Sequence, residues 1–469
     1  MTRPPFAKFS VPLAALWLAG CSMAPAYHVP TAVAPTPAFR AEPGWAAAQP
    51  ADAVAKGEWW HLFGDAVLDS LESRVVVTNQ NVAYYRAAYA QALAAVRVDR
   101  AALLPGAGVT AGANRQGTVS GRGTPASTFT VTGTATWTPD LWGSLSNTLS
   151  AGKATAQASA AQLANAALSA QGTLATDYFA LRGIDADAAM LDDTIASYRK
   201  SLTVTRNKYA SGTASSADVD TAQTTLANAE ASRRDLARQR TGYETAIAVL
   251  VGENPSTFTL VAAEWHPVVP DVPGVVPSAV LERRPDVAAA ERQVAAANAQ
   301  IGVARAAFFP TVNLTASVGS DAGAVSKLFG AATSLWSLGA SAAETLLDWG
   351  ARSAKVAGAR AAYDQTVATY RQTVLTAFQE VENDLSAVSA YRAENASYAQ
   401  AAEAAIRAET VQRNSYQAGT VDFTAVTSAQ ALAYSARVNL ITSTVNRQTA
   451  AVSLIQAIGG RWDAPTTQP

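Results

Sequence analysis

Thr128-Phe129-Thr130-Val131-Thr132-Gly133-Thr134-Ala135-Thr136-Trp137-Thr138 is a stretch in which threonine occupies every second position. Side chains of a β-strand alternate between two faces, so the threonines would share one face. Phe129, Val131 and Trp137 would lie on the other face with two small residues. The stretch therefore predicts a strand with one apolar face and one hydroxyl face.

A second stretch, 311–318, has the same alternation. Its apolar positions are Val312, Leu314, Ala316 and Val318, and its polar positions are Thr311, Asn313, Thr315 and Ser317. We expect a second amphipathic strand here.

The chain contains one unit of about two hundred residues twice, which fixes much of its architecture. Asn207, Tyr209, Gly212, Thr213, Ala222, Gln223 and Gly252 recur 207 residues later as Asn414, Tyr416, Gly419, Thr420, Ala429, Gln430 and Gly459. Upstream, residues 82–105 recur as 287–310 with a shift of 205. A proline-rich linker joins the two units.

The duplication supplies two more strands. A shift of 207 carries Phe129 and Val131 to Trp336 and Leu338, so the apolar face is kept. Trp137 maps to Glu344, which we expect beyond the apolar band. The counterpart of strand 311–318 is the glycine-rich stretch 109–114, where the pattern is weaker.

Long helices occupy the rest of each unit. First helices over 81–104 and 286–309 are ended by Pro105 and Pro310, and Pro285 suits a first helical position. Helices over 145–205 and 352–413 would each be about 90 Å long. Each would turn at a Gly-Thr pair and return, over 216–250 and 422–458, as an antiparallel hairpin.

The amphipathic strands suit either a soluble sheet with one wet face or a membrane β-barrel. Strands of about ten residues and an almost wholly hydroxyl polar face favour the barrel. Four strands cannot close a barrel, and lipid forbids an open edge. Two copies would give a barrel filled by side chains, whereas three could leave a passage, so a duct needs at least three copies. The predicted fold is mainly α, internally duplicated, with a membrane β-barrel that several chains share.

The N-terminus has the layout of a secretory signal, with Arg3 and Lys8 before an apolar stretch over 11–20. Leu18-Ala19-Gly20-Cys21 resembles a bacterial lipobox, and Cys21 is the only cysteine. An ordinary signal peptide with an incidental cysteine is the alternative. We expect a diacylglycerol and an N-acyl chain on Cys21, no other cofactor, and sorting to the outer membrane because Ser22 follows.

These features divide the chain into six segments. They are a lipoprotein signal peptide (1–20), a lipid-anchored extended segment (21–60), the first repeat (61–262), the Pro-rich linker (263–277), the second repeat (278–462) and a C-terminal tail (463–469).

Composition and motifs argue against other functions. The net charge of −1 gives no basic field for nucleic acid. No stretch reaches the roughly 18 apolar residues that a spanning helix needs. Three scattered histidines give no metal spacing, and three methionines give no soft-metal route. A weak dinucleotide-like fingerprint at 106–111 follows a helix rather than a strand, and P-loop, HExxH and GxSxG patterns are lacking, so we expect no catalytic residue.

One long motif and several short ones carry a family resemblance. The long motif is Arg284-Pro285-Asp286-Val287-Ala288-Ala289-Ala290-Glu291, continuing through 297–305 to Phe308-Phe309-Pro310. The short ones are Trp59-Trp60, Gly64-Asp65 with Leu68 and Leu71, Asp348-Trp349-Gly350, and Ala377-Phe378-Gln379-Glu380-Val381-Glu382. Over nearly the whole mature chain the sequence resembles the outer membrane factors, the TolC-like efflux channels, and among them the NodT-type lipoproteins that serve RND pumps.

The resemblance implies a homotrimer with a twelve-stranded β-barrel in the outer membrane and a long-helix α-barrel below it. It also implies that this trimer is a passive duct that works with a periplasmic adaptor and an inner-membrane RND pump. It implies adaptor contacts at the hairpin turns, through Tyr209, Gly212, Thr213, Tyr416, Gly419 and Thr420. A plain helix cap is the alternative for these glycines.

Aperture acids near the periplasmic end are implied as well, at Asp218, Asp220 and Asp422. Helix-terminal acids favoured by the macrodipole are the alternative. Relatives often have Asp where this chain has Ser428. The residue of the second repeat that corresponds to Asp218, which we call its mate, is Ala425. A gate that depends on those acids is therefore in doubt. A type I secretion duct and a helical envelope scaffold are the runner-up functions; the lipobox disfavours the first and the lipid-facing strands disfavour the second.

Overall fold

The computed structural model describes residues 22–30, 38–39, 42–43, 58–117, 119, 124–270 and 284–460. The chain forms two compact structural units, which do not coincide with the two sequence repeats, and each is assembled from three segments. The first comprises Met1–Thr31, Tyr89–Ser159 and Ala289–Tyr370, and the second comprises Ala32–Ala88, Ala160–Ala288 and Arg371–Pro469. Signal segment 1–20, Cys21, residues 271–277 of the proline-rich linker and the tail 463–469 lie outside the described residues.

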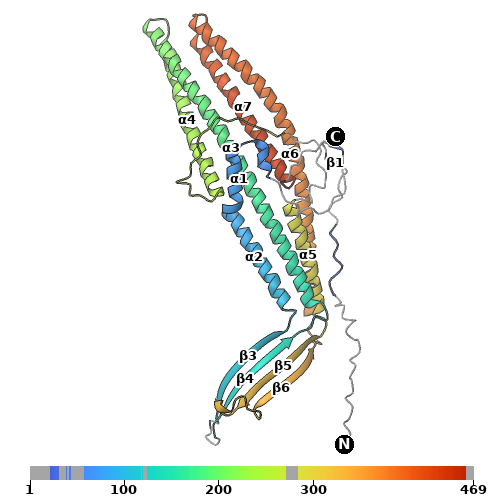
Figure 1. Ribbon diagram of the computed structural model, residues 1–469. Helices are drawn as coiled ribbons and strands as arrows, with labels where there is room; N and C mark the ends of the chain where they lie inside the picture. Colours follow the sequence, from blue (N-terminus) through green and yellow to red (C-terminus); the bar gives the residue numbers. More distant parts are fainter. Residues whose placement is uncertain are drawn as a thin grey trace, which may run out of the picture. The chain divides into compact units, whose positions relative to one another are not determined.

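The first unit contains a four-stranded antiparallel sheet in the order β3-β4-β5-β6 (Figure 1). Its strands are β3 (Gly106–Gln116), β4 (Ala126–Trp137), β5 (Thr311–Ala322) and β6 (Ser334–Ala343). All four predicted strands are confirmed, including the glycine-rich one. The backbone N–H and C=O groups of each stretch form hydrogen bonds with a neighbouring strand. The stretch at β3 therefore forms a strand beside β4, although its own alternation of apolar and polar residues is weak.

The register of the sheet preserves the sequence duplication. Gly106 pairs with Thr136 in the first hairpin, and Thr311 pairs with Ala343 in the second. The shift of 205 carries Gly106 to Thr311, and the shift of 207 carries Thr136 to Ala343. The two hairpins therefore have the same internal register, and the duplication is structural as well as sequential.

The two shorter helices end earlier than predicted. α2 covers Gln80–Ala101 and α5 covers Pro285–Ala306, three residues short of the expected ends at Leu104 and Phe309. Just before Pro105 the backbone forms a tighter, 3-10-type turn, in which the Leu104 N–H donates to the Ala101 carbonyl, three residues earlier, at 3.0 Å. Proline disfavours helical dihedrals at the residue before it, so the last turn leaves the α-helix.

The long helices confirm the predicted hairpins. α3 (Ser144–Ala210) and α6 (Ala351–Gln417) have 67 residues each, or about 100 Å. α4 (Ser216–Leu250) and α7 (Phe423–Ala457) return beside them with 35 residues each (Figure 1). Equal lengths in both repeats follow from the duplication.

A helix that the sequence did not predict, α1 (Ala66–Thr78), follows the short 3-10 turn η2 (Trp59–Phe63). Asp65 caps it by accepting hydrogen bonds from the Val67 and Leu68 N–H groups at 2.9 and 3.1 Å. Its apolar face packs against α3 in the core of the second unit, where the Phe63 and Phe179 rings are 4.8 Å apart. The Trp59-Trp60 motif thus belongs to that core.

Three short elements complete the described structure: β1 (Ala38–Phe39) paired with β2 (Glu42–Pro43), and the 3-10 turn η4 (Val325–Lys327) in the β5–β6 connection. Residues 22–30 have no helix or strand, as expected of an extended segment. None of the described helices has the length and apolar character needed to cross a bilayer.

Candidate functional site

The sheet separates its side chains by chemistry, as the alternation predicted. Gly133 lies opposite Val318, which lies opposite Trp336, so apolar positions line up across three strands. The predicted lipid-facing residues all fall on this face: Phe129, Val131, Trp137, Val312, Leu314, Trp336 and Leu338. Glu344, the mate of Trp137, follows the last residue of β6 and pairs with Arg352 at 2.6 Å, clear of the apolar band.

This apolar face is open in the single chain. Trp336 and Leu338 are each 76% exposed, and Val318 is 65% exposed. A contiguous patch of large, exposed apolar side chains indicates a surface that is covered by lipid or by another protein. The sheet is therefore not a soluble sheet with its apolar side against a core of its own.

The opposite face is built from hydroxyl groups. The Ser317 and Ser337 hydroxyls are 2.8 Å apart, and Thr138 Oγ1 donates to Asn313 Oδ1 at 2.6 Å just beyond β4. Ser320 departs from the pattern, because it shares the apolar face; it is buried and accepts the Phe329 N–H at 3.1 Å in the turn. A face of short hydroxyl side chains is suited to water rather than to a packed core.

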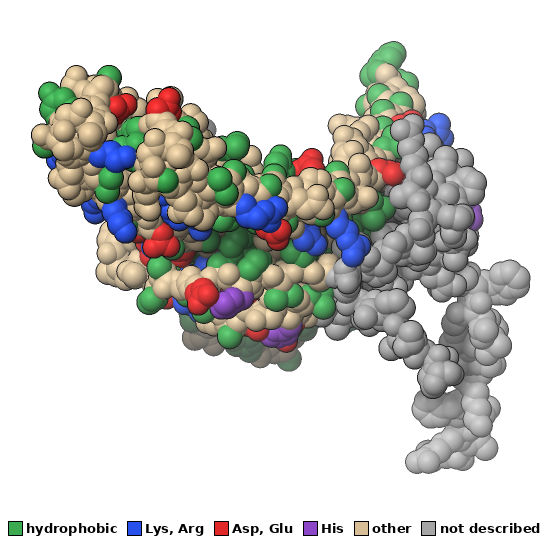
Figure 2. Space-filling view, turned by 90° about the horizontal axis from the view of Figure 1, so that it is seen from above, with side chains coloured by type: hydrophobic (Ala, Val, Ile, Leu, Met, Phe, Trp, Pro, Cys, Tyr) green, Lys and Arg blue, Asp and Glu red, His purple; other side chains and the backbone are tan. Residues whose placement is uncertain are grey.

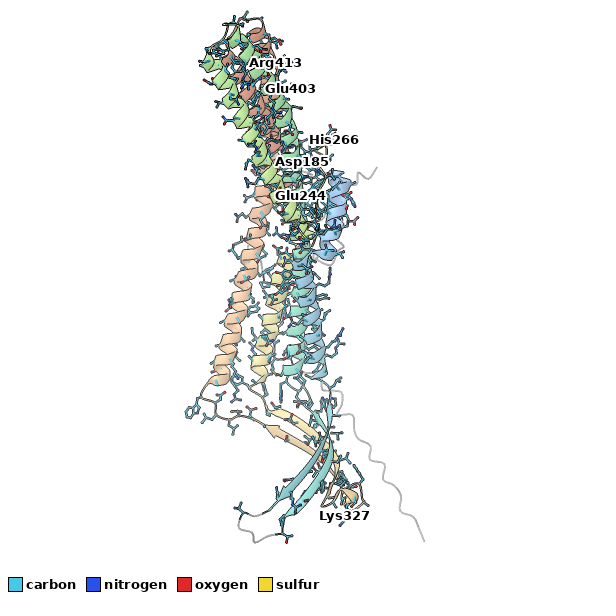
Figure 3. The ribbon with its side chains drawn as sticks, turned by 90° about the vertical axis from the view of Figure 1, so that its left-hand side faces the viewer. Asp185, Glu244, His266, Lys327, Glu403 and Arg413 are labelled. Carbon is cyan, nitrogen blue, oxygen red and sulfur yellow. The ribbon has the colours of Figure 1, made fainter. Side chains whose placement is uncertain are left out.

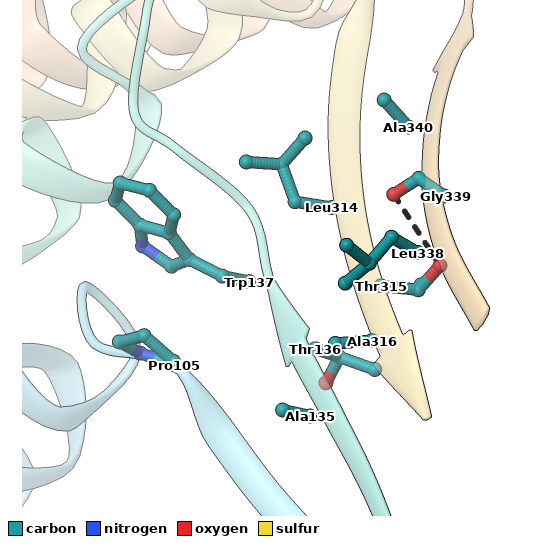
Figure 4. A pocket seen from close by; sticks show the side chains of 10 residues that line it. All are labelled: Pro105, Ala135, Thr136, Trp137, Leu314, Thr315, Ala316, Leu338, Gly339 and Ala340. Carbon is teal, nitrogen blue, oxygen red and sulfur yellow. Dashed lines mark hydrogen bonds between the residues drawn. The ribbon is translucent and has the colours of Figure 1, made fainter. Parts of the chain in front are cut away.

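A groove of about 490 Å³ lies on the sheet near its junction with the helices (Figure 4). Its side chains are largely those of the apolar face: Ala135, Trp137, Leu314, Ala316, Leu338 and Ala340, with Pro105 at one end. Trp137 Nε1 donates to the Leu103 carbonyl at 3.0 Å, which fixes the ring with its polar atom toward the helix end. Such an orientation suits an aromatic residue at a boundary between apolar and wet surroundings.

The two hairpin turns have the same hydrogen-bond pattern. Thr213 N–H donates to the Lys208 carbonyl at 2.8 Å, and Thr420 N–H donates to the Ser415 carbonyl at 3.0 Å. Gly212 and Gly419 have φ of 74° and 76°, the left-handed conformation of a Schellman cap. The cap explains both glycines structurally, and the open space around each leaves the backbone accessible.

The two predicted tip tyrosines differ in their surroundings. Tyr209 is 52% exposed, whereas Tyr416 is 8% exposed and packs on Phe423 with ring centroids 5.4 Å apart. Lys208 Nζ lies 3.7 Å from the Tyr416 ring centroid and donates to the Tyr416 carbonyl at 3.0 Å. Tyr416 therefore joins the two hairpins to each other, and only the Tyr209 side chain is free for a partner.

The predicted aperture acids occupy helix starts. Ser215 Oγ accepts the Asp218 N–H at 3.2 Å while Asp218 accepts the Ser215 N–H at 2.9 Å, a capping box that begins α4. Asp422, the repeat mate of Ser215, caps α7 by accepting the Ala425 N–H at 2.9 Å. Asp220 and Ser428 lie further along these helices and are exposed in the single chain.

A buried ionic cluster that the sequence did not reveal anchors the end of the first repeat, just before the linker. Asp185 on α3 accepts from Arg240 of α4 at 2.7 Å and pairs with Arg182 at 3.3 Å. Arg182 donates to the Val261 carbonyl at 2.9 Å, and Glu244 accepts the Leu260 N–H at 2.7 Å (Figure 3, where Asp185 and Glu244 are labelled). The i,i+4 spacing of Arg240 and Glu244 was the available signal.

The Arg284-Pro285-Asp286 motif has a structural explanation. Arg284 is 7% exposed and binds Asp286 at 2.7 Å, Glu380 at 2.6 Å and the Ala457 carbonyl at 3.1 Å. Burial and the nearby Glu380 carboxylate raise the pKa of Asp384 to about 6. These groups border a polar cavity of about 350 Å³ in the second unit.

The described residues after Cys21 contact α5 and the first turn of α3. Ser22 Oγ donates to Asn147 Oδ1 at 2.9 Å, Asn298 donates to the Pro25 carbonyl at 2.9 Å, and Arg305 donates to the Met23 carbonyl at 3.3 Å. A Cβ on Gly302 would come within 2.8 Å of Ala24, so the glycine makes room for this segment.

Charges on the described surface are mixed. Acidic and basic side chains alternate over the face in Figure 2, which offers no single-sign field of the kind that nucleic acid requires. Within the described residues there is no group of three metal-ligating side chains.

The sheet with its open apolar face, together with the long helical hairpins, is typical of a protein that is partly embedded in a membrane. The chain belongs to the outer membrane efflux protein family, whose model matches residues 72–253 and 276–460. It is 30% identical to outer membrane protein OprJ of Pseudomonas aeruginosa over 99% of this chain and 97% of that one. It is 28% identical to the toluene efflux pump outer membrane protein TtgC of Pseudomonas putida, with 98% and 96% covered. The MtrE outer membrane channel of Neisseria gonorrhoeae has the same fold, with a TM-score of 0.83, 25% identity, and 94% and 98% of the two chains covered.

Proposed function

We propose that the chain is the passive exit duct of a tripartite efflux system, assembled as a homotrimer in the outer membrane. A periplasmic adaptor and an inner-membrane RND pump are its partners, and the pump supplies the energy. The observation that carries the proposal is the sheet: four registered strands with an open apolar face and two unpaired edges. Unpaired backbone groups in lipid cost several kcal/mol each, so further copies must complete the cylinder. Three copies give twelve strands, with the hydroxyl face toward a watery passage.

The cargo we propose is small organic molecules of varied chemistry. Relatives of this chain carry names that refer to antibiotic, toluene and pyoverdine export. The proposed passage is lined by hydroxyl groups rather than by the charged rings that make a channel selective, so we assign the selection of cargo to the pump.

Deleting the gene tests this function directly. The deletion strain should accumulate a panel of antibiotics and solvents to higher levels, and plasmid-borne wild type should restore export. Detergent extracts of the outer membrane should contain a trimer that dissociates on heating. Unchanged accumulation together with a water-soluble monomer in the absence of detergent would refute the proposal.

We further propose that Cys21 is acylated and that residues 22–27, held along α5, lead from the anchor. Mass spectrometry of the mature N-terminal peptide should find a diacylglycerol and an N-acyl chain on Cys21. An unmodified thiol would show that the leader is an ordinary signal peptide.

The hairpin turns are the proposed adaptor contacts, with Tyr209, Gly212 and Thr213 presenting the more open surface. Gly212→Val places a β-branched residue at φ 74°, at a local cost of about 1–2 kcal/mol. Efflux should fall while the trimer still assembles, because the change lies at the surface of the tip. Ala210→Val, two residues earlier within α3, is the matched control. Wild-type efflux and normal adaptor crosslinking in the Gly212 variant would argue that the turn is only a helix cap.

We propose Asp220 as the aperture acid of the first hairpin, because Asp218 and Asp422 are already engaged as helix caps. Asp220→Asn should therefore change the cation preference of the pore in planar bilayers without unfolding α4.

A further inference from the structure

The connection between β5 and β6 folds back over the apolar face of the sheet. Ser320, near the end of β5, belongs to that face and is 3% exposed. Its hydroxyl accepts the Phe329 N–H at 3.1 Å and donates to Thr333 Oγ1 at 3.1 Å, and both partners belong to the connection. Ala322, the next residue on the same face, is buried as well. The connection therefore packs on the apolar side of the sheet.

This connection lies at the end of the sheet that is remote from the helices. α5 precedes β5 and α6 follows β6, so both junctions with the helices lie at the opposite end of the hairpin. Lys327, in η4, marks the far end of the sheet in Figure 3. In the proposed duct the helices extend into the periplasm, so the connection reaches the outer leaflet of the outer membrane.

The connection exposes two large apolar side chains. Val325 is 62% exposed and Phe329 is 72% exposed. Phe329 also has φ 64°, in the left-handed region that a bulky residue rarely adopts, whereas a glycine would adopt it without strain. A strained backbone that holds an aromatic ring in the open points to a use for that ring. Aromatic residues at the two borders of a membrane typically lie among the lipid headgroups.

Positive charge accompanies these apolar side chains. Arg115 of β3 is two residues beyond Ala113, which pairs with Phe129, so Arg115 lies on the apolar face at the far end of its strand. Arg115 and Lys327 are both exposed, and neither has an ion-pair partner among the residues that the structure describes. Asp321, at the same end of β5, falls on the hydroxyl face. This end of the sheet therefore presents cations on the lipid side and an acid on the watery side.

We propose that a rim formed by Arg115, Val325, Lys327 and Phe329 binds a phosphorylated glycolipid of the outer leaflet. The inference rests on the proposed function, because the orientation of the duct places the rim in that leaflet. Arg115 and Lys327 donate to phosphate oxygens, as basic side chains at a lipid surface commonly do. Val325 and Phe329 contact the acyl chains just below the headgroup.

The positions of the two cations favour a glycolipid over a phospholipid. Arg115 belongs to β3 and Lys327 follows β5, and these strands are separated by β4. Two strand spacings amount to about 10 Å. Two phosphates held apart on a disaccharide match that spacing better than the single phosphate of a phospholipid.

Binding of lipid A to the purified full-length trimer in detergent, counted by native mass spectrometry, tests the rim. Lys327→Gln and Arg115→Gln should each weaken binding about fivefold, since one cation near a lipid surface contributes about 1 kcal/mol. Phe329→Gly should weaken it too, through loss of the ring. The temperature at which the Phe329→Gly trimer dissociates should not fall, because glycine adopts φ 64° freely.

The matched control is Lys355→Gln, which makes the same change at an exposed lysine of α6 and should bind lipid A as the wild type does. Lipid A without its phosphates and phosphatidylglycerol are the comparison probes, and both should bind more weakly than lipid A. Wild-type affinity in the Lys327→Gln, Arg115→Gln double variant, or equal binding of the dephosphorylated probe, would overturn the proposal. Tighter binding of phosphatidylglycerol would overturn the assignment to a glycolipid.

These failures are distinguishable from a failure of the proposed function. A rim that binds no glycolipid leaves the wild-type trimer assembled in the outer membrane and able to export a test antibiotic. Absence of the trimer or of export in the wild-type protein itself would instead defeat the proposed duct.

Discussion

Leu338→Arg is expected to abolish the assembled outer-membrane form of this protein, whereas Ser337→Arg, one residue earlier, should assemble. Leu338 lies mid-strand on the apolar face and is 76% exposed in the single chain. An arginine in mid-bilayer on a barrel surface costs about 2–4 kcal/mol, and a homotrimer carries the change three times. Ser337 points to the hydroxyl face, where its hydroxyl lies 2.8 Å from that of Ser317.

The comparison separates the membrane face from the strand itself. Both variants introduce the same arginine side chain into the same strand, so a general folding defect would affect both. The measurements are the heat-dissociable trimer in outer-membrane extracts and the export of a test antibiotic in the deletion strain. Equal loss of trimer in both, or a normal trimer with Leu338→Arg, would contradict the assignment of the lipid face.

The features that the sequence predicted best are those with a local period. Alternation along 128–138 depends only on successive side chains, so it located β4 and its two faces to within two residues. The constant shift of 207 residues between the repeats then predicted the position of β6 from that of β4. The alternation within β6 alone is a weaker signal, because Leu335 lies on the hydroxyl face. The helix ends before Pro105 and Pro310 were placed three residues too far on, because the last turn tightens before the proline itself.

Sequence reasoning failed where the surroundings of a residue depend on distant contacts. Tyr209 and Tyr416 occupy the same position in the repeat, yet only Tyr416 is covered, by Lys208 and Phe423. The repeated sequence predicts the same local structure for both repeats, but it does not show which repeat packs against the other at a given residue. The same reason applies to Asp185, which nothing local marks as the centre of a buried cluster.

Glu72→Gln is expected to raise the thermal stability of the protein at pH 8 and to raise it much less at pH 5. Glu72, on α1, is completely buried, and neither of its carboxylate oxygens has a hydrogen-bond partner. Burial, with a smaller effect of the nearby Asp69, raises the pKa of Glu72 to about 9. The side chain is therefore neutral in the folded protein at physiological pH.

The sign of the pH dependence follows from proton binding. A glutamate in the unfolded chain has a pKa of about 4.3. Between that pH and about 9 the folded protein holds one more proton than the unfolded chain, so the free energy of unfolding falls as pH rises. The slope is about 1.4 kcal/mol per pH unit, so up to about 4 kcal/mol is lost between pH 5 and pH 8. Glutamine has the shape of the neutral acid and cannot ionise, so the variant lacks this slope.

Thermal melts of wild type, Glu72→Gln and the exposed control Glu403→Gln at pH 5 and pH 8 measure the effect. Asp384, with a pKa raised to about 6, contributes the same slope to all three proteins and cancels in the comparison. A packing fault introduced by the new amide group in Glu72→Gln would appear equally at both pH values, whereas the ionisation penalty of Glu72 is much larger at pH 8 than at pH 5. Parallel pH profiles for wild type and Glu72→Gln would mean that Glu72 finds a partner when the copies assemble, and that its carboxylate is charged in the working duct.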